Sequence, residues 1–299
     1  MRRDAWILFL LLSATAMTAT AQAQHARFVL FGDPNPEASR VSAQEKFVHP
    51  ITAPYTHENA MITSDVRAWY IYHDFPSASA IDGGRANAVA VQVRLALTDR
   101  LQFVAYKDGY IDLASGLVDD SGLIDLAAGL KFAVYQDFDT QTHFAIGAGY
   151  EFGIGDDEVL QDDEEFRLWA SFDKGFDKLH LGANVNVYFG DDDDGDAFGD
   201  SDHLSWHLHA DYYLLEWFSP VIELNGYYVF SEGDVVLPFQ GVDLLNLGGV
   251  KDEYAMTIGL GGEFRINEQW SVRAAYETPI LDAQDLFGYR WTVSAVFSF

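Results

Sequence analysis

Apolar residues alternate with polar or small residues from about Ile62 to Phe299. The last segment is the clearest example, because one of its faces carries Tyr289, Trp291, Val293, Ala295, Phe297 and Phe299. Its other face carries Arg290, Thr292, Ser294 and Ser298, with Val296 as an apolar exception. The segments 179–189 and 142–152 sort in the same way. A period of two predicts β-strands whose two faces meet different surroundings.

Two architectures give strands with one apolar and one polar face. In a soluble sandwich the apolar face packs against a second sheet, whereas in an outer-membrane barrel it faces lipid and the polar face lines the lumen. The alternating segments run for about 10–14 residues, which is long for a soluble strand and suits a tilted spanning strand. Aromatic residues also stand at segment ends, where a membrane barrel has its girdles: Tyr150, Trp217, Trp270 and Trp291. Both features favour the membrane barrel.

The connections between these segments alternate between short and long. Short ones fall at 98–100, 137–139, 174–177, 217–219 and 267–268, and long ones near 75–86, 111–121, 154–163, 190–202, 231–250 and 279–287. Short periplasmic turns and longer outer loops are typical of outer-membrane barrels, and this set joins about twelve strands. The sequence therefore predicts an all-β fold, a transmembrane antiparallel up-and-down β-barrel of about twelve strands, with short periplasmic turns and long acidic outer loops.

The residues before this pattern divide into two parts. Residues 1–23 have a basic start, a short apolar core and an Ala21-x-Ala23 cleavage motif, which together predict a signal peptide for export. Residues 24–60 contain four prolines, so they predict no regular strand. We expect them to enter the lumen as a plug or to pack at the periplasmic mouth, with a loose extension as the alternative. The barrel domain is expected over 61–299.

The C-terminal pattern Trp291-x-Val293-x-Ala295-x-Phe297, closed by Phe299, resembles the signal that the barrel-assembly machinery reads in outer-membrane proteins of Gram-negative bacteria. This resemblance, which extends to most of the mature chain, implies that Trp291, Phe297 and Phe299 form the assembly signal. It also implies an outer-membrane location, with lipid, lipopolysaccharide and the assembly machinery as partners. The turn Leu97-Thr98-Asp99-Arg100-Leu101 resembles those of the transporter family associated with the MetA pathway of phenol degradation. That second likeness covers one turn.

Composition excludes several classes of protein. The chain has 46 acidic and 18 basic residues and a net charge of -28, so we expect no nucleic acid among its partners. It has no cysteine, which excludes disulfides, thiolate metal sites and cysteine nucleophiles. After roughly the first twenty residues, no apolar run is long enough for a spanning helix. We expect no cofactor.

Basic residues of the strands fall almost entirely on the polar face. A base that faces lipid at the bilayer midplane costs ~2–4 kcal/mol, so these residues should point into the lumen. The pore-lining residues that we predict are Arg67, Arg94, Lys131, Arg167, His180, His207, His209, Glu223, Arg265, Arg273 and Arg290. Such groups either select solutes in an open pore or pair with one another and fill a narrow barrel. Aromatic residues expected on the same face suit an apolar or aromatic solute, or simple packing: Trp69, Tyr135, Trp169, Tyr188, Tyr213 and Tyr227.

Acidic residues cluster in two expected outer loops, at 156–164 and 191–202. The EF-hand pattern fails there, because Gly195 at position six puts Gly190 at position one and Ser201 at position twelve. The favoured interpretation is a solvated, self-repelling loop surface. A loose calcium site is the weaker one, with the ligands Asp191, Asp193, Asp194 and Asp196. We predict no other metal site.

His203, Ser205, His207 and His209 share the polar face of one segment. The His203-x-Ser205 pattern resembles outer-membrane phospholipases, but the alternation places the pair inside, away from lipid. We therefore predict no enzymatic activity. The favoured function is an outer-membrane channel for small solutes, with a lumen suited to hydrophobic or aromatic ones. A barrel enzyme acting on lipid or lipopolysaccharide and a closed structural or adhesive barrel stay open as alternatives.

Overall fold

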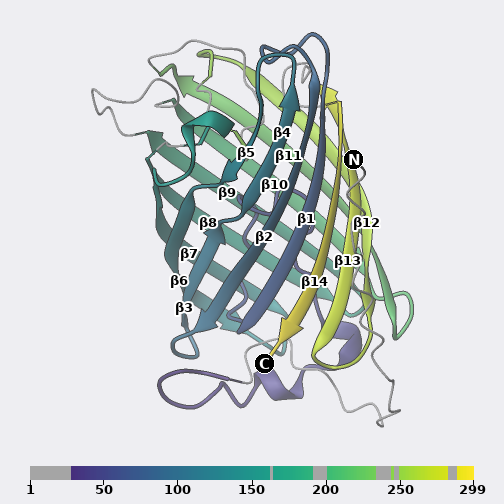
Figure 1. Ribbon diagram of the computed structural model, residues 1–299. Coiled ribbons are helices and arrows are strands. Elements are labelled where there is room, and N and C mark those ends of the chain that lie inside the picture. The colour runs from purple at the N-terminus through teal and green to yellow at the C-terminus, as the bar shows by residue number, and fades with distance from the viewer. Residues whose placement is uncertain (1–27, 162–163, 191–200, 234–243, 246–248, 282–287) are drawn as a thin grey trace, which may run out of the picture.

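The computed structural model describes residues 28–161, 164–190, 201–233, 244–245, 249–281 and 288–299, and its strands form one closed antiparallel sheet (Figure 1). The strand segments are β1 (Asp65–Phe75), β2 (Gly84–Ala96), β3 (Leu101–Lys107), β4 (Tyr110–Ser115), β5 (Asp119–Leu123), β6 (Leu126–Asp137), β7 (Thr142–Phe152), β8 (Glu165–Phe176), β9 (Leu179–Gly190), β10 (Asp202–Tyr212), β11 (Phe218–Ser231), β12 (Tyr254–Arg265), β13 (Trp270–Leu281) and β14 (Tyr289–Ser298). β1 pairs with both β2 and β14, which closes the barrel. Within the described ranges, no helix is long and apolar enough to cross a membrane.

The 14 segments make twelve wall strands because two strands are interrupted. β3 and β4 both pair with β2 and together make one wall strand. β6 pairs with β3 and β5 pairs with β4, so β5 and β6 together make the next wall strand. The expected count of about twelve is therefore confirmed. The long loop expected at 111–121 is wrong, because β4 and β5 extend through this stretch and residues 116–118 alone connect them.

The interruption between β3 and β4 lies at Asp108 and Gly109. Gly109 has a φ of +136°, and a Cβ atom there would lie 2.4 Å from the carbonyl oxygen of Val89, so a side chain does not fit. The Asp108 carboxylate accepts a hydrogen bond from the Val91 N–H at 3.2 Å, which gives that donor a partner where the ladder is broken. β2 thus stays bonded across the break. The break also disturbs the alternation that would have marked the strand in the sequence.

Side chains of the wall alternate between an outward apolar face and an inward polar face. In β8, for example, Leu168 and Phe172 point outward and are exposed, whereas Arg167 and Ser171 point inward and are buried. Exposed aliphatic and aromatic side chains recur along most of the strands. Such an outward surface matches the hydrocarbon of a bilayer, so the barrel is of the transmembrane kind.

A bulge between Ala133 and Tyr135 changes the register of β6 against β7. Tyr135 consequently points outward and is exposed, so its expected place in the lumen is wrong. An inserted residue of this kind reverses the faces beyond it, which strict alternation does not foresee. The other expected lumen aromatics keep their places, with Tyr213 half-buried and Trp69, Trp169, Tyr188 and Tyr227 buried.

The N-terminal part of the chain lies at the end of the barrel that carries the short turns and the C-terminus (Figure 1). It forms two short 3-10 helices, η1 (Ala38–Arg40) and η2 (Ala43–Glu45), while a third, η3 (Asp157–Val159), belongs to an outer loop. Residues 47–64, called the inner segment below, then lead into β1 and are buried apart from the half-buried His49. The predicted signal peptide at 1–23 lies outside the described residues.

The outward face makes a testable prediction about charge. Leu168 lies within β8 and points outward, so Leu168→Arg should lower the free energy of unfolding in lipid vesicles by roughly 2–4 kcal/mol. The control Leu168→Phe keeps the position apolar and should change it by about 1 kcal/mol or less. Denaturant titration followed by tryptophan fluorescence measures both variants. An arginine variant as stable as the parent protein would contradict the lipid-facing assignment.

Candidate functional site

The inner segment passes through the barrel without joining the sheet. Pro50 and Pro54 have no backbone N–H and disfavour a regular ladder. The other buried backbone groups still need hydrogen-bond partners, because leaving them unpaired costs free energy. Inward side chains of the wall supply many of these partners. The candidate site is therefore the inner segment together with the wall residues that bond to it.

Three wall carboxylates accept hydrogen bonds from backbone N–H groups of the inner segment. Glu223 on β11 accepts from Ile51 at 3.0 Å and from Thr52 at 2.6 Å. Asp211 on β10 accepts from Val48 at 3.0 Å, and Asp173 on β8 accepts from Ala60 at 2.5 Å. Hydrogen bonds to a charged acceptor are stronger than neutral ones. These carboxylates fix the path of the segment along one side of the lumen.

Histidines of the wall orient two of those carboxylates. His209 lies between Glu223 and Asp211, with Nδ1 at 2.7 Å from Glu223 Oε1 and Nε2 at 3.2 Å from Asp211 Oδ2. His180 adds a contact of 2.7 Å from Nδ1 to Asp211 Oδ1. All four side chains are buried. His180 and His209 were expected to line a pore, and the structure places them behind the inner segment as supports of its acceptors.

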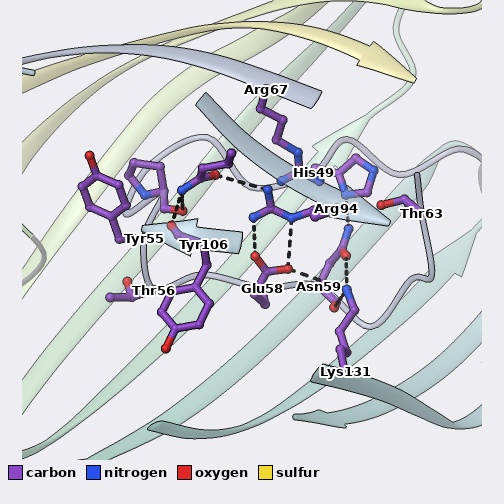
Figure 2. Close-up of polar contacts among 12 residues, drawn as sticks. His49, Tyr55, Thr56, Glu58, Asn59, Thr63, Arg67, Arg94, Tyr106 and Lys131 are labelled. Atoms are coloured by element: carbon purple, nitrogen blue, oxygen red, sulfur yellow. Dashed lines mark hydrogen bonds and ion pairs between the residues drawn. The ribbon is translucent and has the colours of Figure 1, made fainter. Parts of the chain in front are cut away.

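Glu58 is the acidic residue of the inner segment, and it faces two wall cations (Figure 2). Arg94 Nη2 donates to Glu58 Oε1, and Arg94 Nε lies 3.4 Å from Oε2. Lys131 Nζ lies 3.6 Å from Oε2 and donates to the Asn59 carbonyl oxygen at 2.9 Å. Burial alone would raise the pKa of Glu58, but Arg94 and Lys131 outweigh burial and hold this pKa at about 2. Glu58 is therefore a buried carboxylate anion.

Arg167 on β8 holds the next turn of the segment. Its Nη1 donates to the Tyr55 carbonyl oxygen at 2.9 Å, and its Nη2 donates to the carbonyl oxygen of Thr56. The guanidinium carbon also lies 4.7 Å from the ring centres of both Tyr106 and Trp169. Cation–π contact and two charge-assisted hydrogen bonds thus act on one side chain.

Neutral side chains of the wall complete the contacts. Gln92 donates to the Pro54 carbonyl oxygen at 3.0 Å, and Ser171 donates to that of Glu58 at 2.7 Å. Gln102 donates to the carbonyl oxygen of Thr63 at 2.6 Å. The segment is thus held along most of its length by polar contacts.

The remaining predicted bases pair with acids or histidine of the wall itself. Arg67 lies 2.6 Å from Asp65, and Arg273 lies 2.8 Å from Glu263. Arg265 is half-buried and contacts Glu263 at 3.2 Å. In the same way, Arg290 bonds to His73 at 3.0 Å and lies 4.0 Å from Glu277. The predicted pore-lining set therefore divides into residues that hold the inner segment and residues that are neutralised within the wall.

His207 belongs to a hydrogen-bonded chain inside the barrel. Its Nε2 lies 3.0 Å from Ser205 Oγ, and its Nδ1 lies 2.8 Å from Asn225 Oδ1. The His57 ring of the inner segment stacks on the His207 ring with centres 4.9 Å apart. The serine and histidine are buried and point away from the lipid-facing surface, as the alternation predicts.

No group of three or more metal-ligating side chains able to hold an ion occurs in the part of the chain that the structure describes. The calcium candidates Asp191, Asp193, Asp194 and Asp196 lie outside the described residues.

Part of the interior is apolar. One cluster joins Ile71, Phe75, Ile111 and Leu113 of the wall to Val48, Ile51 and Tyr55 of the inner segment, and residues of the outer connections pack on it: Ile81, Val159, Leu160, Leu244 and Leu245. Buried charged groups also lie toward the outer ends of the strands, for example Lys107 with Glu151 and Arg290 with His73. This mixture of apolar and charged parts was not foreseen from the sequence. Glu58 was also missed, although it is the sole acidic residue between 46 and 64 and stands in an otherwise neutral stretch.

The residues of the predicted assembly signal lie on or beside β14. Trp291 faces outward and is exposed. Phe297 contacts Trp270 with ring centres 4.8 Å apart. The Phe299 N–H donates to the Ser64 carbonyl oxygen at 3.0 Å, which ties the C-terminus to the start of β1. Their role in assembly stays a prediction.

No family model matches the chain, and no curated protein matches it. Solved structures of several barrels are similar to it. The KdgM porin has a TM-score of 0.45 and 11% identity over 78% of this chain and 99% of that one. The translocator domain of the autotransporter NalP from Neisseria meningitidis has a TM-score of 0.45 and 12% identity over 79% and 88%. The toluene transporter TodX from Pseudomonas putida has a TM-score of 0.41 and 12% identity over the same shares. The likeness is one of fold alone.

The Glu58 site makes a testable prediction. Glu58→Gln leaves Arg94 and Lys131 buried without their carboxylate, and removal of one partner of a buried pair costs about 3–5 kcal/mol. Release of the inner segment should therefore become at least about 100-fold more frequent. Trypsin cleavage after the buried Lys46 of the folded barrel measures this release.

Two references accompany the measurement. Cleavage after the exposed Arg40 needs no release and should keep its rate. The control Glu37→Gln changes an exposed carboxylate near η1 and should leave both cleavage rates unaltered. Equal Lys46 cleavage in Glu58→Gln and the parent protein would show that the ion pair does not hold the segment.

Proposed function

We propose that this protein is an outer-membrane passage for small solutes that its inner segment closes at rest and opens by leaving the lumen. The observation that carries the proposal is that charged side chains of the wall bond to the inner segment. They are Arg94, Lys131, Arg167, Asp211 and Glu223.

The backbone of the segment needs partners in any case, but a barrel that is closed permanently does not need charged ones, because neutral side chains such as Gln92 and Ser171 also bond to this backbone. Wall charges can neutralise one another, as Arg67 with Asp65 and Arg273 with Glu263 do. Wall side chains that bond to the inner segment lose those partners when the segment leaves, and water can then bind to them. Water replaces polar contacts at low net cost, whereas exposure of a tightly packed apolar core has no such compensation. Val48, Ile51 and Tyr55 of the segment also join the apolar cluster of the interior. The many polar contacts along the rest of the segment support a segment that can be withdrawn.

The same proposal includes the finer expectations from the sequence. Export and assembly would place the barrel in lipid and lipopolysaccharide, with Trp291, Phe297 and Phe299 read by the assembly machinery. The apolar cluster of the interior supports passage of hydrophobic or aromatic solutes, in keeping with the turn that resembles the MetA-pathway transporters. A closed structural barrel is the competing function, and the experiment below separates the two.

A disulfide between the inner segment and the wall tests the proposal. A Cβ atom on Gly259 of β12 would lie 3.3 Å from Thr52 Cβ, close to the ~3.5–4.5 Å of bonded cysteines. The chain has no cysteine of its own, so Thr52→Cys with Gly259→Cys gives a single crosslink. In planar bilayers the oxidised double variant should show no discrete conductance, and reduction should restore openings of the kind that the parent protein shows.

The single variants Thr52→Cys and Gly259→Cys are the matched controls, and their conductance should not respond to reductant. Conductance that is equal in the oxidised and reduced double variant would mean that the segment is not in the solute path. An absence of conductance in the parent protein, in the reduced variant and in Glu58→Gln would favour the closed structural barrel.

A further inference from the structure

The Glu58 carboxylate occupies a cationic site that belongs to the wall (Figure 2). Arg94 comes from β2 and Lys131 from β6, and both are buried with exposed fractions of 1% and 0%. The other charged groups that act on this pair are Arg67 and three carboxylates, Asp65, Asp108 and Asp173. Asp65 is also the ion-pair partner of Arg67. Once Glu58 leaves, two cations of the wall therefore face the lumen without the carboxylate that neutralised them.

Arg167 repeats this arrangement with backbone oxygens. The two terminal nitrogens of its guanidinium donate to the carbonyl oxygens of consecutive residues, Tyr55 and Thr56. Two neighbouring oxygens in front of a guanidinium fork stand in for the two oxygens of a carboxylate, which arginine binds in the same bidentate way. When the inner segment is withdrawn, Nη1 and Nη2 lose these two carbonyl oxygens, while Asn186 Oδ1 of the wall stays bonded to Nε at 3.1 Å and to Nη2 at 2.7 Å.

Aromatic side chains join the two cationic positions. Tyr106 on β3 contacts the Arg167 guanidinium with its ring, while its backbone carbonyl accepts a hydrogen bond from Gln92, which in turn accepts one from Arg94. The Trp169 ring also contacts the Arg167 guanidinium, and its buried indole N–H has no hydrogen-bond partner among the residues that the structure describes. Beside the cations, the wall thus presents the ring faces of Tyr106 and Trp169 and the indole N–H of Trp169 as a hydrogen-bond donor.

We propose that Arg94, Lys131 and Arg167, with Tyr106 and Trp169, form a binding site for a small aromatic carboxylate, which the inner segment fills at rest with Glu58 and two carbonyl oxygens. The proposal rests on the passage function proposed above and names its solute class. Such a solute and the inner segment compete for the same groups, so the solute that is carried also promotes opening. A planar carboxylate fits the fork, and its ring lies against the aromatic faces.

Benzoate is the probe for this site, and benzyl alcohol is its uncharged counterpart. With the full-length protein in planar bilayers, benzoate should raise the fraction of time open at least tenfold, and benzyl alcohol should leave it unchanged. Glu58→Gln removes the competing carboxylate. The benzoate concentration that gives half of the maximal effect on Lys46 cleavage or on current should therefore be at least tenfold lower in this variant. Arg94→Gln in the Glu58→Gln background should remove the response.

The comparison of Glu58→Gln with the parent protein does not depend on whether the arginine variant folds. Arg100→Gln, in an exposed turn, removes one positive charge elsewhere and should keep the full benzoate response. Openings that ignore benzoate, or that respond equally to benzyl alcohol, would overturn the site and leave the passage standing. Benzoate-dependent cleavage at Lys46 without any current would support the site and refute the passage instead.

Discussion

The hydrogen bonds of a backbone that is buried but not part of the sheet determine the interior of this barrel. Inside a closed wall, the inner segment cannot leave its N–H and C=O groups unpaired without a large cost. Proline at two positions keeps it out of the ladder, so the wall must supply partners through its side chains. Glu223, Asp211 and Arg167 take up this role, so the need of the segment for partners explains why these charges lie inside the barrel.

Two ways of neutralising charge coexist on the same wall, and their difference carries the functional account. The ion pair of Arg273 and Glu263 joins two neighbouring strands, so it persists whether the inner segment stays or leaves. Arg94 with Glu58 joins the wall to a separate piece of chain. An apolar cluster, where loop residues pack on Ile111 and Leu113, shares the interior with these charged groups. An interior with both kinds of surface suits a solute that has both a charged group and a ring.

Sequence reasoning predicted the wall well and its contents poorly, for a physical reason. Alternation is a local property, so it assigned the inward face of Arg94, Lys131 and Arg167 correctly. It failed at Tyr135, where one inserted residue reverses the faces, and near residue 108, where an Asp-Gly break hides a strand. Partners such as Glu58 for Arg94 join residues far apart in the chain, and nothing in a periodic pattern encodes such contacts.

Hydrogen exchange of the inner segment in lipid vesicles tests the central claim most directly. If the segment is withdrawn as a unit, the amides of Val48, Ile51, Thr52 and Ala60 should exchange together, at one common rate far above that of amides in β8 and β11. The polar contacts that hold these four amides make such a shared opening the expected behaviour. Exchange of these amides only as slowly as the wall strands would contradict the account, because the segment would then leave its place only when the whole barrel unfolds.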